Sequence, residues 1–236
     1  MIDFTVIGSG SSGNAVVIAR QILIDCGLPA KRILPYAPAL KLILLTHIHG
    51  DHFRPATVRA LHRERPTLRW GCCEWMVPPL LDAGVDRRQI DVYELNGMDY
   101  LYSWNMWSMG DVGIMPVELS HNVRNCGYHI RFPDGRKVFY ATDTGYIDNV
   151  KAPGYDLYLI EANHTEAEIA ARIAEKHASG AYAYEEQAAV NHLSREQAEA
   201  WLARNAGPES QYVFLHGHQE AVNLCPGDER RRMQEW

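Results

Sequence analysis

Residues 42–52 read Leu42-Ile43-Leu44-Leu45-Thr46-His47-Ile48-His49-Gly50-Asp51-His52 and combine a strand pattern with a cluster of potential metal ligands. The first four residues are a short apolar run bounded by polar residues, which is typical of a buried β-strand. The loop that follows carries three imidazoles and one carboxylate. His47 and His49 are two apart on an extended segment and therefore point to the same side, whereas Asp51 and His52 follow as the chain turns. We expect one metal ion at His47 and His49, and a neighbouring ion at Asp51 and His52.

Three later apolar strands also end in residues suited to metal binding. His121 follows the predicted strand 112–119, Asp143 follows 137–141, and His216 follows 211–215. Sheet proteins commonly build their sites at the carboxyl ends of strands. Together the loop and these residues supply five histidines and two aspartates, enough for two divalent metal ions that share one carboxylate. Imidazole and carboxylate without thiolate favour Zn²⁺, with Mn²⁺ or Fe as alternatives.

The rest of the chain alternates between short strands and helices. We predict further strands over residues 4–7, 15–19, 22–25, 68–70, 92–95, 100–107, 128–132 and 156–160. Helices are predicted over residues 30–36, 55–65, 75–83, 166–177, 194–203 and 228–236, with Pro55 in the first turn of one and Ser194 as the cap of another. No internal repeat or low-complexity linker is present.

Two further segments are candidates for substrate binding. The loop 8–14 is rich in glycine and serine, so Ser9, Ser11 and Asn14 could bind an anion or simply close the turn. It lacks the pattern of a P-loop. A basic run begins at Arg54 beside the histidine-rich loop and continues with Arg59, Arg63, Arg65 and Arg69. It is either a substrate-binding patch or a solvated helix face.

The composition limits the class of protein. The chain has 236 residues, which suits one large domain or two small ones, and 47% hydrophobic and 22% charged residues are ordinary values for a globular protein. The net charge of −6 argues against a protein that coats nucleic acid non-specifically. No apolar run approaches the ~20 residues of a membrane span. Five cysteines without a C-x-x-C spacing suggest a reducing compartment. We therefore expect a cytoplasmic protein without a membrane partner.

The order of these residues resembles the metallo-β-lactamase superfamily: the H-x-H-x-D-H motif at 47–52, then His121, Asp143 and His216. The resemblance implies an α/β (α+β) fold, an αββα sandwich with two β-sheets face to face and helices outside, built as a single domain from residues 1–236. It also implies that His47, His49 and His121 hold one metal ion. Asp51, His52 and His216 would hold the other, and Asp143 would bridge the two.

Three short segments narrow the resemblance to the YycJ/WalJ-type branch, whose members are implicated as DNA exonucleases. They are Ser9–Ala15, Glu161–Asn163 and His192–Ser194. The chain departs from this branch at His164 and Thr165, where tyrosine and aspartate are usual. It departs again at its last strand end, where the branch has an H-L-S-R-E-N-like sequence and this chain keeps the histidine but reads His216-Gly217-His218-Gln219-Glu220.

These features predict a dinuclear metal-dependent hydrolase, a phosphodiesterase or nuclease that resembles a DNA exonuclease. Two metal ions lower the pKa of a bridging water, and the resulting hydroxide attacks phosphorus or a carbonyl carbon. Asp51 could orient that hydroxide. His192, His164 and His218 are candidates for the general acid that protonates the leaving oxygen. Asn163 and Ser194 could bind phosphate, although a helix cap explains Ser194 equally well.

Two other functions are compatible with the same residues. One is hydrolysis of a small ester, thioester or lactone, because one fold hosts many chemistries. The other is a metal-stabilised binding protein without activity, which the complete set of ligands argues against. The expected partner is nucleic acid or another phosphodiester substrate, and the sequence leaves the oligomeric state open.

Overall fold

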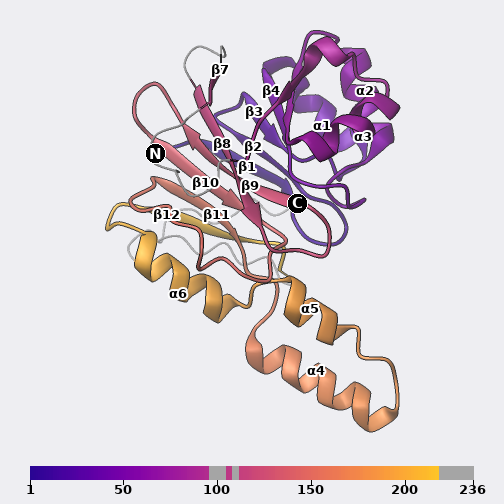
Figure 1. Ribbon diagram of the computed structural model, residues 1–236, viewed down its shortest axis with the longest axis vertical. Helices are drawn as coiled ribbons and strands as arrows, with labels where there is room; N and C mark the ends of the chain where they lie inside the picture. Colours follow the sequence, from indigo (N-terminus) through magenta and orange to yellow (C-terminus); the bar gives the residue numbers. More distant parts are fainter. Residues whose placement is uncertain (96–104, 108–111, 218–236) are drawn as a thin grey trace.

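Two six-stranded β-sheets lie face to face, with helices on their outer sides, in the computed structural model, which describes residues 1–95, 105–107 and 112–217 (Figure 1). The first sheet has the order β1 (Phe4–Gly8), β2 (Ala15–Ile18), β3 (Ile22–Ile24), β4 (Leu42–Leu45), β5 (Arg69–Cys72) and β6 (Ile90–Val92). The second has the order β12 (Gln211–Leu215), β11 (Leu157–Glu161), β10 (Lys137–Ala141), β9 (Asn125–Arg131), β8 (Val112–Leu119) and β7 (Asn105–Trp107). The predicted αββα sandwich is confirmed.

Three hydrophobic cores separate the four layers. One lies between the first sheet and the helices α1 (Ala30–Ile33), α2 (Pro55–Glu64) and α3 (Val77–Asp82). A second lies between the two sheets, and a third lies between the second sheet and α6 (Arg195–Asn205). In the third core the Trp201 ring stacks on Phe139 with centroids 5.0 Å apart. These cores fix the relative positions of the strand ends.

The central strand β4 shows why the sequence at residues 42–45 is apolar without interruption. It pairs in parallel with β3 on one side and β5 on the other. Ile43 and Leu45 point into the outer core, and Leu42 and Leu44 into the core between the sheets. Parallel strands covered on both faces are continuously hydrophobic for this reason. The loop after β4 therefore begins at a fixed point of the sheet edge.

Two helices, α4 (Glu166–Ser179) and α5 (Glu185–Asn191), form an arm that projects away from the sandwich (Figure 1). The Thr165 hydroxyl accepts a hydrogen bond from the Glu168 N–H in a capping box, and Gly180 ends α4 in the left-handed conformation. Ile169 is the one buried residue of α4. Helix α4 is thus stabilised at both ends by its caps and makes few contacts with the core.

Most predicted elements are present, with shifted boundaries. The predicted strand 92–95 lies at residues 90–92, and the strand predicted from residue 128 begins at Asn125. Short 3-10 turns occur at η1 (Leu34–Ala39), η2 (Glu74–Met76) and η3 (Arg87–Gln89). The first replaces the end of the predicted helix 30–36, because Pro35 cannot continue an α-helix. Helix α5 has no counterpart in the prediction. The predicted helix 228–236 and most of the predicted strand 100–107 lie outside the described residues. Within the described part of the chain, no helix has the length and apolarity needed to cross a membrane.

Candidate metal centre

Asp25 anchors the histidine-rich loop from beneath. It follows β3 directly, has a left-handed backbone with φ of 62°, and is fully buried. Its Oδ1 accepts the backbone N–H of Thr46 at 3.0 Å, and its Oδ2 accepts Nδ1–H of His52 at 2.7 Å. The Thr46 hydroxyl also donates to this carboxylate. The loop after β4 is therefore tied to the end of the neighbouring strand.

The hydrogen bonds of the imidazoles fix which ring nitrogen faces the centre. His47 donates Nδ1–H to the Thr46 hydroxyl oxygen at 2.9 Å, because that hydroxyl already donates to Asp25. His121 donates Nδ1–H to the Asn191 carbonyl at 3.1 Å. In both rings the lone pair is then on Nε2, which points to the centre. A ring N–H bonded away from the site in this manner is typical of metal-ligating histidines.

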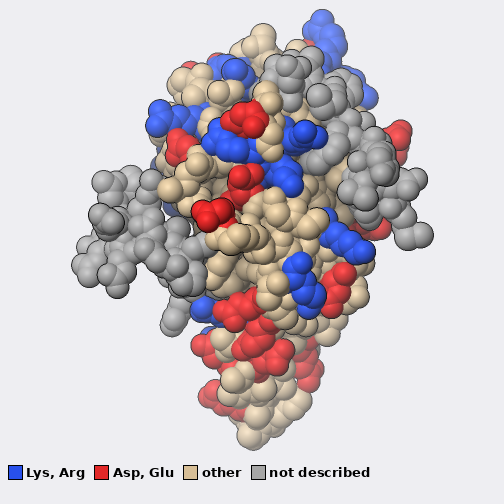
Figure 2. Space-filling view, turned by 90° about the vertical axis from the view of Figure 1, so that its left-hand side faces the viewer, with Lys and Arg blue, Asp and Glu red and all other residues tan. Residues whose placement is uncertain are grey.

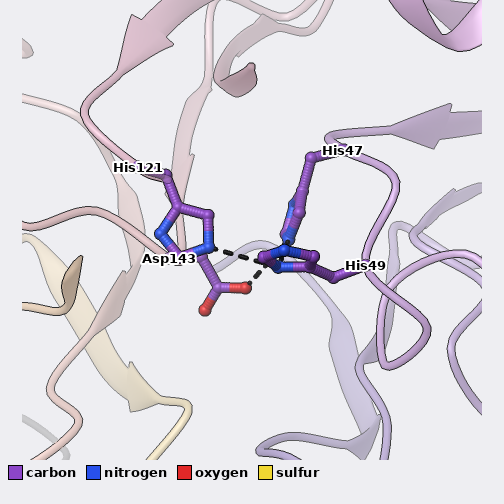
Figure 3. Close-up of side chains that lie close together, drawn as sticks. All are labelled: His47, His49, His121 and Asp143. Carbon is purple, nitrogen blue, oxygen red and sulfur yellow. Dashed lines mark hydrogen bonds and ion pairs between the residues drawn. The ribbon is translucent and has the colours of Figure 1, made fainter. Parts of the chain in front are cut away.

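The first cluster contains His47, His49, His121 and Asp143, whose ligand atoms all lie within 4.8 Å of one another (Figure 3). Nδ1 of His49 lies 3.2 Å from Nε2 of His47 and 3.3 Å from Nε2 of His121. Oδ2 of Asp143 lies 3.2 Å from Nε2 of His47. The structure thus brings the three histidines predicted for one metal ion together with the predicted bridging carboxylate.

The second cluster contains Asp51, His52, Asp143 and His216. Nε2 of His52 lies 2.7 Å from Oδ2 of Asp143, the same oxygen that approaches the first cluster. Nε2 of His216 lies 3.4 Å from Oδ2 of Asp51. The two clusters share Asp143, as the predicted bridging role requires. The assignment of individual ligands to each ion stays a prediction.

Sharp turns at the strand ends aim the ligands of the second sheet. Asp143 lies just after β10 and His216 directly after β12, with φ of 57° and 60°. Non-glycine residues rarely adopt this conformation, which costs of order 1–3 kcal/mol and concentrates at functional sites. Asn125 Nδ2 stabilises one of these turns by donating to the carbonyls of Thr142 and Asp143 at 2.9 and 2.7 Å. The second sheet therefore presents its ligands through backbone turns that the surrounding structure holds in place.

These residues fit divalent metal ions. The two clusters supply nitrogen and carboxylate oxygen without thiolate, which is the donor set of Zn²⁺, Mn²⁺ and Fe sites in proteins. In the metal-free centre, burial disfavours charge on His52, but the carboxylates of Asp143 and Asp25 raise the pKa of His52 well above its usual range. Burial lowers the pKa of His121 to about 4. Beside Asp143 and Asp25, the His52 ring therefore carries a proton in the metal-free centre, and a bound metal ion would displace that proton.

A third group joins Glu161 and His192 to the centre. Glu161 ends β11 and is fully buried, and its Oε1 accepts Nδ1–H of His192 at 2.6 Å and lies 3.1 Å from Nδ1 of His216. Its Oε2 accepts the backbone N–H of Thr144 at 2.8 Å. Glu161 therefore orients one predicted ligand, His216, and one predicted general acid, His192. Both Nδ1–H groups are directed to its carboxylate, which leaves Nε2 of each ring for the site.

A cavity of about 260 Å³ opens over the clusters. Its lining comes from both sheets and from the arm: Ser11, His49, Asp51, His121, Asn122, Asp143, Tyr184, Gln187, Ala188, Asn191, His192 and His216. Of the described residues, no lysine or arginine is among them. The cavity therefore offers imidazoles, carboxylates, amides and one tyrosine to a substrate.

Two of the predicted substrate-binding residues in the loop 8–14 brace the centre instead. Asn14 is buried, accepts the Gly10 N–H at 2.7 Å, and donates to the Asp51 carbonyl at 3.2 Å. The Ser9 hydroxyl oxygen accepts the backbone N–H of His216 at 2.6 Å. Ser11 is exposed and lines the cavity. Of this loop, Ser11 is thus the residue that a substrate would meet.

The other predicted substrate-binding and general-acid residues also differ in whether they line the cavity. Asn163 donates from Nδ2 to the His216 carbonyl at 3.0 Å. Ser194 is buried and accepts the Gln197 N–H at 3.1 Å, so it caps α6, the alternative to phosphate binding. His164 lies outside the cavity lining, whereas His192 is part of it. His218 lies outside the described residues.

The predicted basic patch divides into structural and exposed residues. The Arg65 guanidinium donates to the carbonyls of Ala37 and Pro38, and the Arg69 guanidinium pairs with Asp91. The members exposed to solvent are Arg54, Arg59 and Arg63. None of them lines the cavity, so the prediction that Arg54 contacts a substrate at the metal centre is not supported by its position.

The sequence alone assigned no site role to Asp25, to Glu161 or to the residues of α5, although Glu161 lies in one of the segments that carry the resemblance. Asp25 and Glu161 each stand at the end of a short apolar strand, the same signal that marked Asp143. Their role was hidden because both are buried beneath the ligands and do not face the cavity. The residues of α5 carry no local signal, since only the course of the arm brings them to the cavity.

The comparisons with known proteins agree with this geometry. The family model described as beta-lactamase superfamily domain matches residues 20–216, so the chain belongs to the metallo-β-lactamase superfamily of metal-dependent hydrolases. The exodeoxyribonuclease YycJ of Bacillus anthracis is 24% identical over 180 residues, which cover 69% of this chain and 63% of that protein. The match thus spans less than two thirds of that relative. The predicted resemblance to the superfamily and to its YycJ branch is confirmed.

Two solved structures show the same fold. The metallo-β-lactamase fold protein YhfI from Bacillus subtilis has a TM-score of 0.67 and 17% identity, covering 93% of this chain and 88% of that one. The short form of human tRNase Z has a TM-score of 0.64 and 18% identity, covering 93% of each chain.

Proposed function

We propose that this protein is a dinuclear metal-dependent phosphodiesterase that acts on nucleic acid as a DNA exonuclease-like enzyme. The observation that carries the proposal is the pair of His/Asp clusters that share Asp143, with His192 at their side in one cavity. The relative named exodeoxyribonuclease YycJ supports nucleic acid as the substrate class.

The clusters support ligand roles for seven residues. We propose that His47, His49 and His121 hold one ion, that Asp51, His52 and His216 hold the other, and that Asp143 bridges them, with Zn²⁺ as the favoured metal. When bound, two such ions would polarise the scissile phosphate and lower the pKa of an attacking water. Asp51 lines the cavity and would orient that water with one carboxylate oxygen.

His192 is the candidate for the group that protonates the leaving oxygen. Its Nδ1–H is bound to Glu161, so its Nε2 is the nitrogen that can carry a proton to the substrate. The buried Glu161 carboxylate holds the ring in this orientation. His164, the other described candidate, is outside the cavity lining. A positioned acid of this kind contributes about 10²–10⁴-fold to the rate.

One observation favours hydrolysis of a small ester, thioester or lactone as the second candidate function. Among the described residues, the cavity has no lysine or arginine side chain that could bind the backbone phosphates flanking a scissile bond. Proteins that bind long stretches of nucleic acid depend on such contacts. A nucleic acid substrate would therefore need contacts other than ion pairs with its flanking phosphates, whereas a small ester, thioester or lactone has no such phosphates.

A substrate panel distinguishes the two candidates. Protein loaded with Zn²⁺, Mn²⁺ or Fe²⁺ would be incubated with bis-p-nitrophenyl phosphate, 5′-labelled single-stranded and duplex DNA, and sets of thioesters and lactones. We expect metal-dependent phosphodiester cleavage that shortens labelled DNA from an end. Thioester or lactone hydrolysis without phosphodiester cleavage under any metal would exclude the phosphodiesterase.

Metal content tests the ligand assignment independently of the substrate. We expect two ions per chain in the wild-type protein by elemental mass spectrometry. An Asp143→Ala variant should lose affinity for both ions, since its carboxylate approaches both clusters. If this variant still bound two ions at full affinity, the bridging role of Asp143 would be wrong.

A further inference from the structure

Helix α5 forms one wall of the cavity over the metal centre. Tyr184, Gln187, Ala188 and Asn191 line this cavity together with His49, His121 and His192. Asn191 also accepts Nδ1–H of His121 through its carbonyl, so the helix is coupled directly to a predicted ligand. At the other end of the helix, Tyr184 is 60% exposed. The arm thus places an accessible phenol ring in the same cavity as the reacting centre.

Seven large apolar side chains among the described residues are exposed, and five of them lie in the metal loop, in the loop after Asp143 or in the arm. The seven are Met1, Ile48, Leu81, Tyr146, Tyr182, Tyr184 and Val190. Ile48 lies within the metal loop and Tyr146 in the loop after Asp143, while the last three belong to the arm. The Gln187 side-chain amide donates to the Tyr182 hydroxyl at 2.9 Å. Exposed aromatic groups beside a catalytic centre are typical of recognition of flat, apolar ligand surfaces.

The arm carries more acidic than basic side chains, which disfavours binding of a duplex through its phosphates. The segment 166–191 carries five glutamates against one arginine and one lysine. Glu185 and Glu186 directly follow Tyr184, and Figure 2 shows acidic side chains gathered at the end of the molecule that α4 occupies. A duplex brings two phosphate backbones, which these carboxylates would repel. A single strand brings one, whose reacting phosphate the metal ions would neutralise.

We propose that Tyr184 stacks on the unpaired nucleobase next to the scissile phosphodiester, so that the cavity selects single-stranded DNA ends. The inference rests on the proposed phosphodiesterase function and adds how its substrate is held. Base–aromatic stacking is tolerant of sequence because every base has a π-face. The cavity has a volume of about 260 Å³, just below the ~300–1,000 Å³ of typical small-molecule sites. Stacking would replace the phosphate contacts that the cavity lining lacks.

Binding to a matched pair of oligonucleotides tests the role of the ring. We would measure, by fluorescence anisotropy, the affinity of Zn²⁺-loaded protein for a hexathymidylate with cleavage-resistant phosphorothioate linkages. The comparison ligand is an abasic hexamer with the same linkages. Wild-type protein should bind hexathymidylate more tightly than the abasic strand, and more tightly than the same strand in a duplex.

Variants at one position separate the ring from the hydroxyl. Tyr184→Ala and Tyr184→Leu should weaken hexathymidylate binding by about 5- to 150-fold, with a much smaller effect on the abasic strand. Tyr184→Phe should retain the preference. Val190→Ala is the matched control, because Val190 is on the same helix, is 73% exposed and does not line the cavity. Thermal melting of each variant checks that it is folded.

Two binding results would overturn the inference: equal binding of hexathymidylate and the abasic strand by wild-type protein, or wild-type affinity in Tyr184→Ala. Cleavage of unmodified hexathymidylate separates this outcome from the fate of the proposed function. Tyr184-dependent binding without cleavage under any metal would remove the phosphodiesterase and keep base recognition. Cleavage with the same kcat/KM in wild type and Tyr184→Ala would keep the phosphodiesterase and remove base recognition by Tyr184.

Discussion

The two halves of the metal centre are built in different ways. The half on the first sheet comes from one continuous loop, residues 47–52, which starts at the end of β4. The half on the second sheet combines His121, Asp143 and His216, each from the end of a different strand. A continuous loop needs one anchor to hold its shape, whereas separate strand ends need the whole sheet to be in register. The difference determines which part of each half is most sensitive to substitution.

Each half rests on one fully buried carboxylate, but the two carboxylates do different things. Asp25 binds the backbone of Thr46 and the ring of His52, so it holds the shape of the loop. Glu161 binds the rings of His192 and His216, so it holds groups that would touch the substrate and the metal. We therefore expect substitutions of Asp25 to affect folding most and substitutions of Glu161 to affect chemistry most.

The largest effect is expected for Asp25→Ala. Removing the carboxylate leaves the buried Thr46 N–H and the His52 ring without their partner, which should lower the free energy of unfolding by about 3–5 kcal/mol. Urea denaturation of the metal-free protein measures this loss. Asp3→Ala is the control, because Asp3 pairs with Arg20 at the surface, where such pairs contribute about 0–1 kcal/mol. Similar losses in both variants would show that Asp25 is not the anchor of the first half.

For His192→Ala the expected loss is in rate. Cleavage of phosphodiesters with alkoxide leaving groups should slow by about 10²–10⁴-fold, because these leaving groups need a proton. Cleavage of p-nitrophenyl esters should change far less, since p-nitrophenolate leaves without one. His164→Ala is the matched control, as His164 lies outside the cavity lining. Equal losses on both kinds of ester would assign His192 a role other than proton transfer.

A smaller loss of rate is expected for Glu161→Gln. The amide keeps the size of the side chain but holds His192 and His216 less firmly, and substitutions of this kind typically cost about 10–100-fold in activity or metal affinity. Kinetics and metal titration together measure the effect, with the exposed Glu118→Gln as control. The comparison of the two halves predicts a smaller loss of stability than for Asp25→Ala. The opposite order would contradict it.

The smallest effect is expected for Ser194→Ala, because Ser194 caps α6 and does not line the cavity. Losing the hydrogen bond from the Gln197 N–H to the Ser194 hydroxyl should lower stability by about 1 kcal/mol. Thr165→Ala, which removes the equivalent cap of α4, provides the comparison. A higher KM for phosphodiesters with unchanged stability would instead restore the predicted phosphate-binding role of Ser194.

The sequence predicted the metal ligands best where these residues are neighbours in the chain. The apolar run at 42–45 and the loop at 47–52 define a strand and a ligand set without reference to the rest of the chain. The second half was found through a weaker rule, that polar residues after apolar strands meet at one sheet edge. The rule brought together His121, Asp143 and His216, and the same rule applies to Asp25 and Glu161. It does not say which of these face the cavity and which lie beneath it.

The basic run after the loop shows where adjacency misleads. Five arginines follow the metal loop in sequence, yet Arg65 and Arg69 are bound to nearby carbonyls and a carboxylate, and the exposed members do not line the cavity. Helix α2 turns away from the loop to cover the outer face of the first sheet, so its exposed side faces solvent. Arginines that are close to the metal loop in sequence therefore do not line the cavity.

Local hydrophobic pattern and motifs of fixed spacing were enough to predict the strand at 42–45 and the ligand-bearing loop after it. The sandwich fold was predicted from the resemblance to the superfamily. Only the tertiary structure shows which carboxylates support the ligands and which residues of the arm form a wall of the cavity. Burial of Asp25 and Glu161 depends on the packing of whole sheets, and the approach of Tyr184 depends on the path of an arm that leaves the sandwich and returns to it. Neither property is encoded in the spacing of neighbouring residues.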